Sequence, residues 1–174
     1  MKCMWRGLEA RSTENLQLHH TGDEITARST VITADFEYEY EITLSGQWVF
    51  RTLRLRCRPD RSLELERDAE GNWRVDAKPR ALLVGAIDID LAFSPFTNSL
   101  PIRRLNLKVG ESAEIVAAYV HATTLALRLD PQRYTRLSAD TYLYESLNSD
   151  FRTRITVDAE GLVLDYPGLF RRTR

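Results

Sequence analysis

The feature of this sequence that most constrains its fold is a strict alternation of apolar and polar residues between Phe36 and Leu44. The even-numbered positions carry aromatic or aliphatic side chains, and the odd-numbered positions carry three glutamates and a threonine. Successive side chains of a β-strand point to opposite faces of the sheet, so this period of two predicts a strand that is half buried. One face of the strand is expected to pack in the core, and the other to face water.

The following segment, Val49 to Arg58, alternates in the same way and predicts the partner strand of a hairpin with a loop from Ser45 to Trp48. A slip of the register by one residue would set carboxylates against the apolar row, so the pairing is well specified. The predicted neighbours are Glu39 with Arg54, Glu37 with Arg56, Asp35 with Arg58, Tyr40 with Leu53 and Tyr38 with Leu55. We interpret the charged row as a solvated face and not as a binding patch, because each exposed ion pair contributes only about 0.2–1 kcal/mol.

Similar alternation predicts strands along most of the chain. They are Asn15–His20, Asp23–Thr33, Ser62–Asp68, Glu114–His121, Leu125–Asp130, Arg133–Leu137, Thr141–Leu147, Phe151–Val157 and Leu162–Tyr166. The same four residues, Asp-Ala-Glu-Gly, form two predicted hairpin turns, Asp68–Gly71 and Asp158–Gly161, which hints at two related halves. No window of about ten residues sustains an amphipathic helical period.

These strands predict an all-β fold. The 174 residues suffice for one core, so residues 1–174 are expected to form a single domain. About a dozen strands joined by short turns favour one antiparallel, strongly curved sheet that forms an open or incomplete β-barrel. The concave side of such a sheet must be filled by aromatic side chains, an inserted loop or an apolar ligand.

The obvious insert is the segment around Pro95 and Pro101. Each proline lacks a backbone N–H and is excluded from a central strand, so the sequence predicts a loop from Pro95 to Leu100. The hydroxyl and amide groups at positions 97 to 99 are expected to bond back onto this loop. Four apolar side chains make it unsuited to water and predict a lid-like loop or a plug across the sheet: Phe93, Phe96, Leu100 and Ile102.

Composition excludes several classes of function. A net charge of −1 gives no sign of a nucleic-acid partner. No run approaches the roughly 20 apolar residues of a membrane helix, and the first residues do not resemble a signal peptide, so a cytoplasmic protein is expected. Cys3 and Cys57 are expected to be free buried thiols. His19 and His20 point to opposite faces of a strand, and no metal site or cofactor is predicted.

Several motifs resemble those of a bacterial family described as glycolipid-binding, formerly a domain of unknown function. The main one is Asp88–Leu91 followed by Ser94–Leu105, in which Ser94 and Ser99 stand where the family usually has threonine. Shorter matches are Trp5-Arg6-Gly7, Gln132-Arg133-Tyr134 and the ending from Asp158 to Arg172. The resemblance implies lipid binding by analogy with periplasmic lipoprotein carriers, and it supplies no catalytic residues.

Three classes of function stay open at this point. The first is binding of an amphipathic lipid or glycolipid on the concave face, with tyrosine and tryptophan offering both apolar surface and polar tips. The second is a small-molecule enzyme that uses Asp88 and Asp90, about 7 Å apart on one side of a strand, together with Arg103. The third is a subunit-interaction role, including a homo-oligomer, in which the apolar loop packs on another chain. The candidate ligand-binding residues are Asp88, Asp90, Phe93, Phe96, Thr97, Asn98, Arg103, Arg104 and Tyr134.

Overall fold

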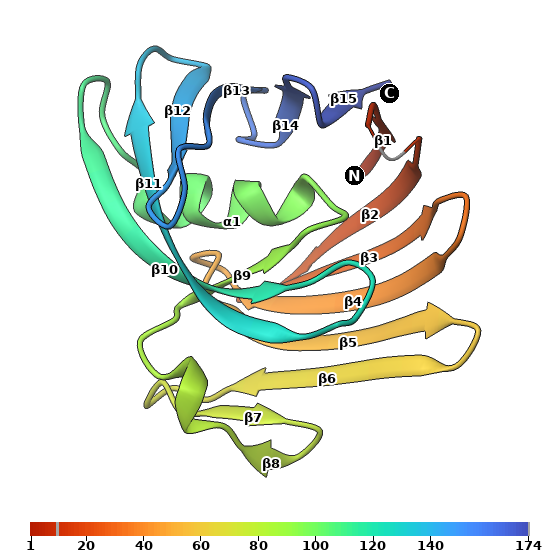
Figure 1. The fold of residues 1–174 in the computed structure, drawn as a ribbon. Coiled ribbons are helices and arrows are strands. Elements are labelled where there is room, and N and C mark those ends of the chain that lie inside the picture. Colours follow the sequence, from red (N-terminus) through yellow and green to blue (C-terminus); the bar gives the residue numbers. More distant parts are fainter. Residues whose placement is uncertain (10, 174) are drawn as a thin grey trace.

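A computed structural model describes residues 1–9 and 11–173 of the chain (Figure 1). The strands of the first half are β1 (Lys2–Gly7), β2 (Thr13–Thr21), β3 (Glu24–Ile32), β4 (Glu37–Ser45), β5 (Phe50–Arg58), β6 (Arg61–Arg67), β7 (Trp73–Val75) and β8 (Lys78–Pro79). Those of the second half are β9 (Asp88–Leu91), β10 (Ser112–Val120), β11 (Leu127–Arg136), β12 (Thr141–Ser146), β13 (Arg152–Val157), β14 (Val163–Tyr166) and β15 (Phe170–Arg172). A 3-10 helix, η1 (Ala81–Leu83), follows β8, and an α-helix, α1 (Phe96–Leu105), follows β9.

All these strands belong to one continuous sheet, in the order β8 to β1 followed by β15 to β9. Neighbouring strands are antiparallel except β9 and β10, which run parallel. The sheet curves strongly and stays open, since β8 and β9 are its two edges (Figure 1). The prediction of an all-β fold with an incomplete barrel is confirmed.

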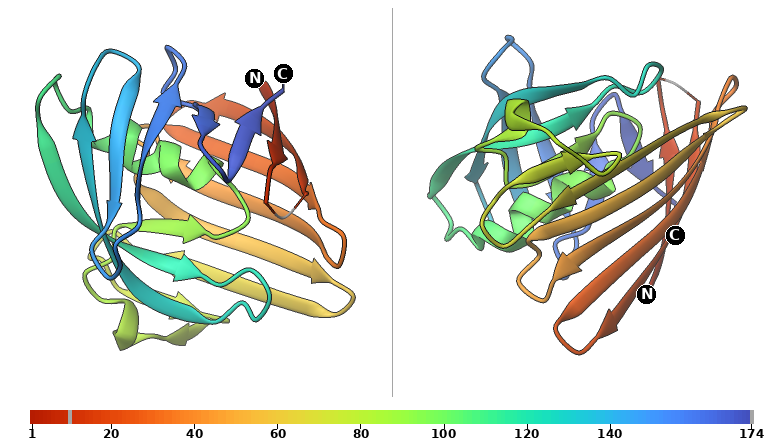
Figure 2. Two further views of the ribbon diagram at one scale, coloured as in Figure 1. Left: turned by 45° about the horizontal axis from the view of Figure 1, so that its top comes forward. Right: turned by 90° about the horizontal axis from the view of Figure 1, so that it is seen from below.

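The two ends of the chain meet in the middle of this sheet. Trp5 lies opposite Arg172 and Gly7 opposite Phe170, so β1 and β15 form an antiparallel pair. Figure 2 shows the amino and carboxyl ends side by side, away from both edges of the sheet. The pairing joins a half that contains β1 to β8 to a half that contains β9 to β15.

The hairpin of β4 and β5 keeps the predicted faces but not the predicted partners. Glu39 lies opposite Arg56, where Arg54 was predicted, and Tyr40 lies opposite Leu55, where Leu53 was predicted, a shift of two residues. The turn extends to Val49, whose carbonyl accepts the N–H of Ser45, and the ladder is irregular between Thr43 and Leu44. The longer turn and the irregularity each shift the pairing by one residue. The total shift of two residues leaves charged side chains opposite charged ones and apolar side chains opposite apolar ones.

The predicted strands Leu125–Asp130 and Arg133–Leu137 are parts of one strand, β11. Pro131 lies inside it without harm, because β12 ends at Ser146, opposite Gln132, so the missing N–H breaks no bond of that ladder. The two Asp-Ala-Glu-Gly turns occur where predicted, between β6 and β7 and between β13 and β14. Their glycines, Gly71 and Gly161, have φ of 87° and 73°.

The predicted loop from Pro95 to Leu100 is wrong, because Phe96–Leu105 forms α1. Pro95 occupies the N-cap position and Pro101 lies inside the helix. The residues from Phe96 to Ile102 are all buried, including three polar ones, so no solvated face exists to give the sequence an amphipathic period. Packing thus forms a helix that local propensity does not favour.

The helix lies within the concavity of the sheet and fills it (Figure 1). The rings of Phe93 and Tyr38 stack with their centroids 4.0 Å apart, and Phe96 lies 6.4 Å from Trp48. Phe96 and Leu100 share one core cluster with residues of β1 to β7. The segment is a buried plug and not a lid, and its apolar side chains are not free to pack on another chain.

Two matched Leu→Ala substitutions test this description. Leu100 has no exposed surface, so Leu100→Ala should lower the free energy of unfolding by about 2–5 kcal/mol through lost burial and a residual cavity. Leu82, which is 52% exposed, should tolerate the same change within about 0.5 kcal/mol. Urea denaturation of both variants measures the difference, and equal losses would contradict the buried position of α1.

Candidate functional site

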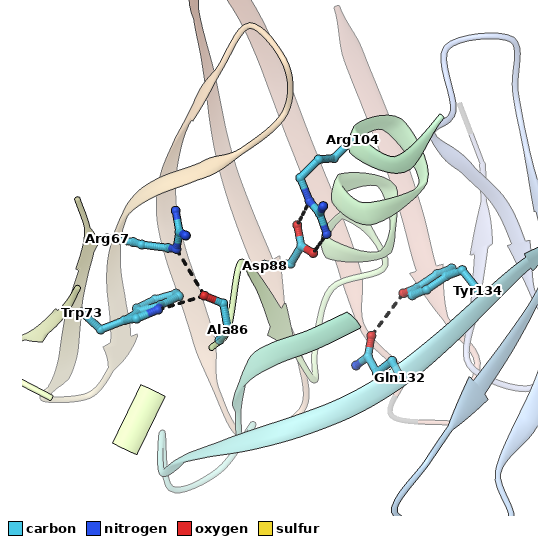
Figure 3. A network of polar contacts seen from close by, with 7 residues as sticks. All are labelled: Arg67, Trp73, Ala86, Asp88, Arg104, Gln132 and Tyr134. Carbon is cyan, nitrogen blue, oxygen red and sulfur yellow. Dashed lines mark hydrogen bonds and ion pairs between the residues drawn. The ribbon is translucent and has the colours of Figure 1, made fainter. Parts of the chain in front are cut away.

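The first of the predicted acidic residues, Asp88, forms a buried ion pair with Arg104 at the end of α1. Arg104 donates from Nε to Oδ1 at 3.0 Å and from Nη2 to Oδ2 at 2.5 Å, a two-pronged contact (Figure 3). Burial raises the pKa of the Asp88 carboxyl, and the hydrogen bonds and charge of Arg104 oppose that rise. The pair connects β9 to α1, and both groups are occupied by each other.

The second, Asp90, belongs to a polar network that reaches across three elements. Gln132 on β11 donates through Nε2 to Asp90 Oδ2 at 2.7 Å and to Asp130 Oδ2 at 3.0 Å. Its Oε1 accepts the hydroxyl of Tyr134 at 3.3 Å, as Figure 3 shows. Asn98 on α1 donates to the same hydroxyl at 3.0 Å. The side-chain amide of Gln132 therefore bridges the carboxylates of Asp90 and Asp130.

The two carboxylates lie on a cavity of about 290 Å³ beside the amino-terminal end of α1. Its walls come from the second half of the chain and from the segment before α1. The lining residues are Asp90, Leu91, Ala92, Ser94, Asn98, Tyr119, Arg128, Asp130, Tyr144, Ser146, Ser149, Phe151, Tyr166, Leu169 and Phe170. We refer to this space as the acidic cavity.

One wall of the acidic cavity is a connected group of aromatic rings. The ring of Tyr144 lies 6.0 Å from both Phe151 and Tyr166, and Tyr166 lies 6.2 Å from Phe170. On another side, the guanidinium of Arg128 lies 4.1 Å from the centre of the Tyr119 ring and forms an ion pair with Asp130. Flat apolar surface and hydrogen-bond acceptors thus face the same volume.

Burial in the cavity wall brings the titration of one carboxyl closer to neutral pH. Burial raises the pKa of Asp90 to about 6, and the charge of Asp130 adds to this rise, against the hydrogen bond from Gln132. Burial also raises the pKa of Tyr144 and of Tyr166, so both phenols stay protonated and can donate hydrogen bonds.

The predicted site residues do not form one cluster. Asp90 and Asn98 line the acidic cavity, and Thr97 and Tyr134 support them, since the Thr97 hydroxyl lies 3.5 Å from Asp90 Oδ1. Phe93 and Phe96 are core residues. Asp88 and Arg104 pair with each other, and Arg103 lies at the far end of α1, away from Asp90. The combination of Asp88, Asp90 and Arg103 in one pocket does not occur.

Other residues of the site were absent from the sequence-based candidates. Asp130, Gln132 and Tyr134 are spaced two residues apart on β11, so their side chains lie on one face of the sheet. Because Tyr134 was already a candidate, this spacing could have identified Asp130 from the sequence. Tyr166 and Phe170 carry no local signal of a site, since their role depends on how β14 and β15 curl towards β12.

Glu14 is a further buried carboxylate that the sequence prediction missed. Its Oε1 accepts hydroxyl groups from Tyr40 at 2.6 Å, Ser94 at 2.8 Å and Ser29 at 2.9 Å. Its Oε2 is buried and has no donor among the residues that the structure describes. Burial raises the pKa of Glu14 to about 7, and the three hydroxyls oppose the shift. The signal in the sequence is that Glu14 alternates in phase with Leu16 and Leu18.

Within residues 1–9 and 11–173 there is no group of three or more His, Cys, Asp or Glu side chains placed to hold a metal ion. Over the same residues, neither helix combines the length and apolar character that crossing a bilayer requires. Cys3 and Cys57 are both buried and free.

Comparison with known proteins places these features in a family. The model of the family described as "Putative glycolipid-binding" matches residues 2–172. The chain belongs to this family. A crystal structure of a DUF1089 family protein from Pseudomonas aeruginosa is similar to this member of the glycolipid-binding family, with a TM-score of 0.82 and 37% sequence identity. The match covers 93% of this chain and 92% of that one. No curated protein matches the chain.

The Asp88–Arg104 pair gives a first prediction for this family member. Arg104→Met leaves the Asp88 carboxylate buried without a partner, which should lower the free energy of unfolding by about 3–5 kcal/mol. As a control, Arg58→Met removes an exposed partner of Glu37 and Glu39 and should cost less than about 1 kcal/mol. Urea denaturation at pH 7 compares them, and a stable Arg104→Met variant would refute a structural role for the pair.

Glu14 gives a second prediction. The folded state holds this proton more tightly than the unfolded state, so the stability it contributes is fully present below pH 4.5 and is lost as the pH rises to about 7. Glu14→Gln keeps the acceptor at Oε1 and removes the titration. Between pH 5 and 8 the wild type should lose about 2–3 kcal/mol relative to this variant. Parallel stability profiles in urea denaturation would contradict the prediction.

Proposed function

We propose that this protein binds a glycolipid through its sugar, in the acidic cavity. The observation that carries the proposal is the juxtaposition of two carboxylates, bridged by Gln132, with a wall of aromatic rings. Sugar hydroxyls donate to carboxylates and accept from phenols, and the apolar face of a sugar ring packs on an aromatic ring. The family description supports the ligand class.

The size of the cavity supports a head group as the bound part. A volume of about 290 Å³ is at the lower end of the range for small-molecule sites, which begins near 300 Å³. The concave side that a lipid chain would need is occupied by α1 and its core contacts. In this proposal the sugar enters the cavity and the acyl chains stay outside, past the half-exposed ring of Phe151.

The role that we propose is binding without chemistry, in the cytoplasm, as the sequence suggests. Of the two carboxylates in the enzyme hypothesis, Asp88 is buried against Arg104 and does not line the acidic cavity, whereas Asp90 lines it and accepts a hydrogen bond from the amide of Gln132. Arg103, the third member of that hypothesis, lines a different cavity, so the proposed acid, base and arginine do not surround one reacting atom. The free buried thiols of Cys3 and Cys57 agree with a reducing compartment.

Two exposed apolar residues provide a matched test of this site. Phe151 is 43% exposed and lines the acidic cavity, whereas Leu164 is 39% exposed and does not. Phe151→Ala should weaken glycolipid binding about ten-fold through loss of ring contact, and Leu164→Ala should leave it unchanged. Both variants should fold as the wild type does, because neither side chain is in the core.

The measurement has two stages. Native mass spectrometry of the purified protein, followed by organic extraction, identifies any lipid that co-purifies. Titration with glycolipids in detergent micelles, and with the corresponding free sugars, then gives the affinities of the wild type and both variants. Binding of lipids without sugars, or equal affinity of Phe151→Ala and Leu164→Ala, would refute a sugar site in the acidic cavity.

A further inference from the structure

A second cavity, of about 430 Å³, lies at the opposite end of α1 and shares no lining residue with the acidic cavity. It is formed between the β4–β5 turn of the first half and the β13–β14 turn of the second. The lining residues are Gly46, Gln47, Trp48, Ile102, Arg103, Arg104, Asn106, Arg136, Ala139, Tyr142, Val157, Asp158, Ala159 and Gly161. We call it the basic cavity.

Arg103 packs between Trp48 and Gly161 at this cavity, with contacts that leave its hydrogen-bond donors free. Its guanidinium carbon lies 5.2 Å from the centre of the Trp48 ring. Its stem passes over Gly161, where a Cβ would lie only 2.6 Å from Arg103 Cδ. No residue among those that the structure describes accepts a hydrogen bond from Arg103 or forms an ion pair with it. A stacked guanidinium with free N–H groups is preorganised for a planar or tetrahedral oxyanion.

The backbone at Trp48 also points to a constrained site. Trp48 has a φ of 65°, a left-handed conformation that is costly for a bulky side chain. This conformation sets the indole ring between Phe96, 6.4 Å away, and Arg103. Trp48, in this strained turn, and Gly161 both contact Arg103.

The remaining charges around the cavity leave it positive. Arg104 is neutralised by Asp88, and Asp158 by Arg172. Arg136 has no acidic partner among the described residues and donates instead to the carbonyls of Leu107, Ser138 and Ala139. Arg103 and Arg136 therefore contribute two positive charges that no acidic side chain neutralises. The partial negative charge at the carboxyl-terminal end of α1 offsets only part of them.

We propose that the basic cavity binds a phosphate group, with Arg103 donating two parallel hydrogen bonds to its oxygens. The free donors, the stacking and the local positive charge favour this ligand class, because charge-assisted paired bonds are the contacts that arginine forms best with phosphate. The phosphate group is the same in an anionic lipid and in a small soluble ester. This site is separate from the proposed sugar site, and either stands if the other fails.

The test compares Arg103→Gln with Arg54→Gln, which removes an arginine from the exposed charged row of β5. Titration calorimetry with inorganic phosphate and with glycerol phosphate measures the soluble source. Flotation with vesicles of phosphatidylcholine and 20% phosphatidylglycerol, a fraction of about one lipid in five chosen to give a surface charge, measures the lipid source. The Phe151→Ala variant checks that the sugar site is independent.

We expect Arg103→Gln to weaken binding of at least one phosphate source about ten-fold or more, while Arg54→Gln and Phe151→Ala bind as the wild type does. Arg103→Lys, which keeps the charge and the stem but not the paired donors, should lose part of the affinity and covers the case that Arg103→Gln fails to fold. If Arg103→Gln weakens the binding of inorganic phosphate or glycerol phosphate, the ligand is a free phosphate ester. If it weakens only the binding to vesicles, the ligand is a lipid head group. No binding in either arm, or an equal loss in Arg103→Gln and Arg54→Gln, would overturn the proposal.

Discussion

The constraint on which this structure depends is that an open, curved sheet leaves one large apolar face on its concave side. Water cannot occupy that face without a large cost in free energy, so the chain itself supplies the filling. The segment from Phe93 to Ile102 does so, with Phe93 stacked on Tyr38 and Phe96 against Trp48. Once α1 is fixed by this packing, Arg103 is placed at its last turn, and Asp88 and Asp90 are placed on β9, the strand that leads into it.

The helix also sorts charge between two ends of the molecule. Asp90 and Asp130 lie near its amino-terminal end, where the helix dipole is positive, and Arg103 lies near its carboxyl-terminal end, where the dipole is negative. The ten residues of α1 span about 15 Å, so the two cavities lie at opposite ends of one buried element. The two cavities therefore differ in the charged groups that line them, although Arg128 offsets Asp130 in the acidic cavity.

Alternation along the chain was enough to predict the sheet, because a period of two is a local property of residues such as those of β4. It was not enough for α1, because the buried position of its polar residues is set by tertiary packing, in which Asn98 donates to the distant Tyr134. The register of β4 and β5 failed for a related reason, since an irregularity at Thr43 is invisible in a pattern of residue types. Two candidates from the central motif, Asp90 and Asn98, do line the acidic cavity. The aromatic wall could not be predicted, because it forms only where strands β12 to β15 curl towards one another.

The pairing of β1 with β15 makes the order of synthesis matter for this chain. Strands β1 to β8 form antiparallel neighbours in sequence and can assemble while the ribosome is still making the second half. The outer edge of β1 then stays without a partner until residues 170–172 emerge. During that interval it is an open strand edge of the kind that pairs with foreign chains. Pairing with β15 thus covers the open edge of a nascent sheet.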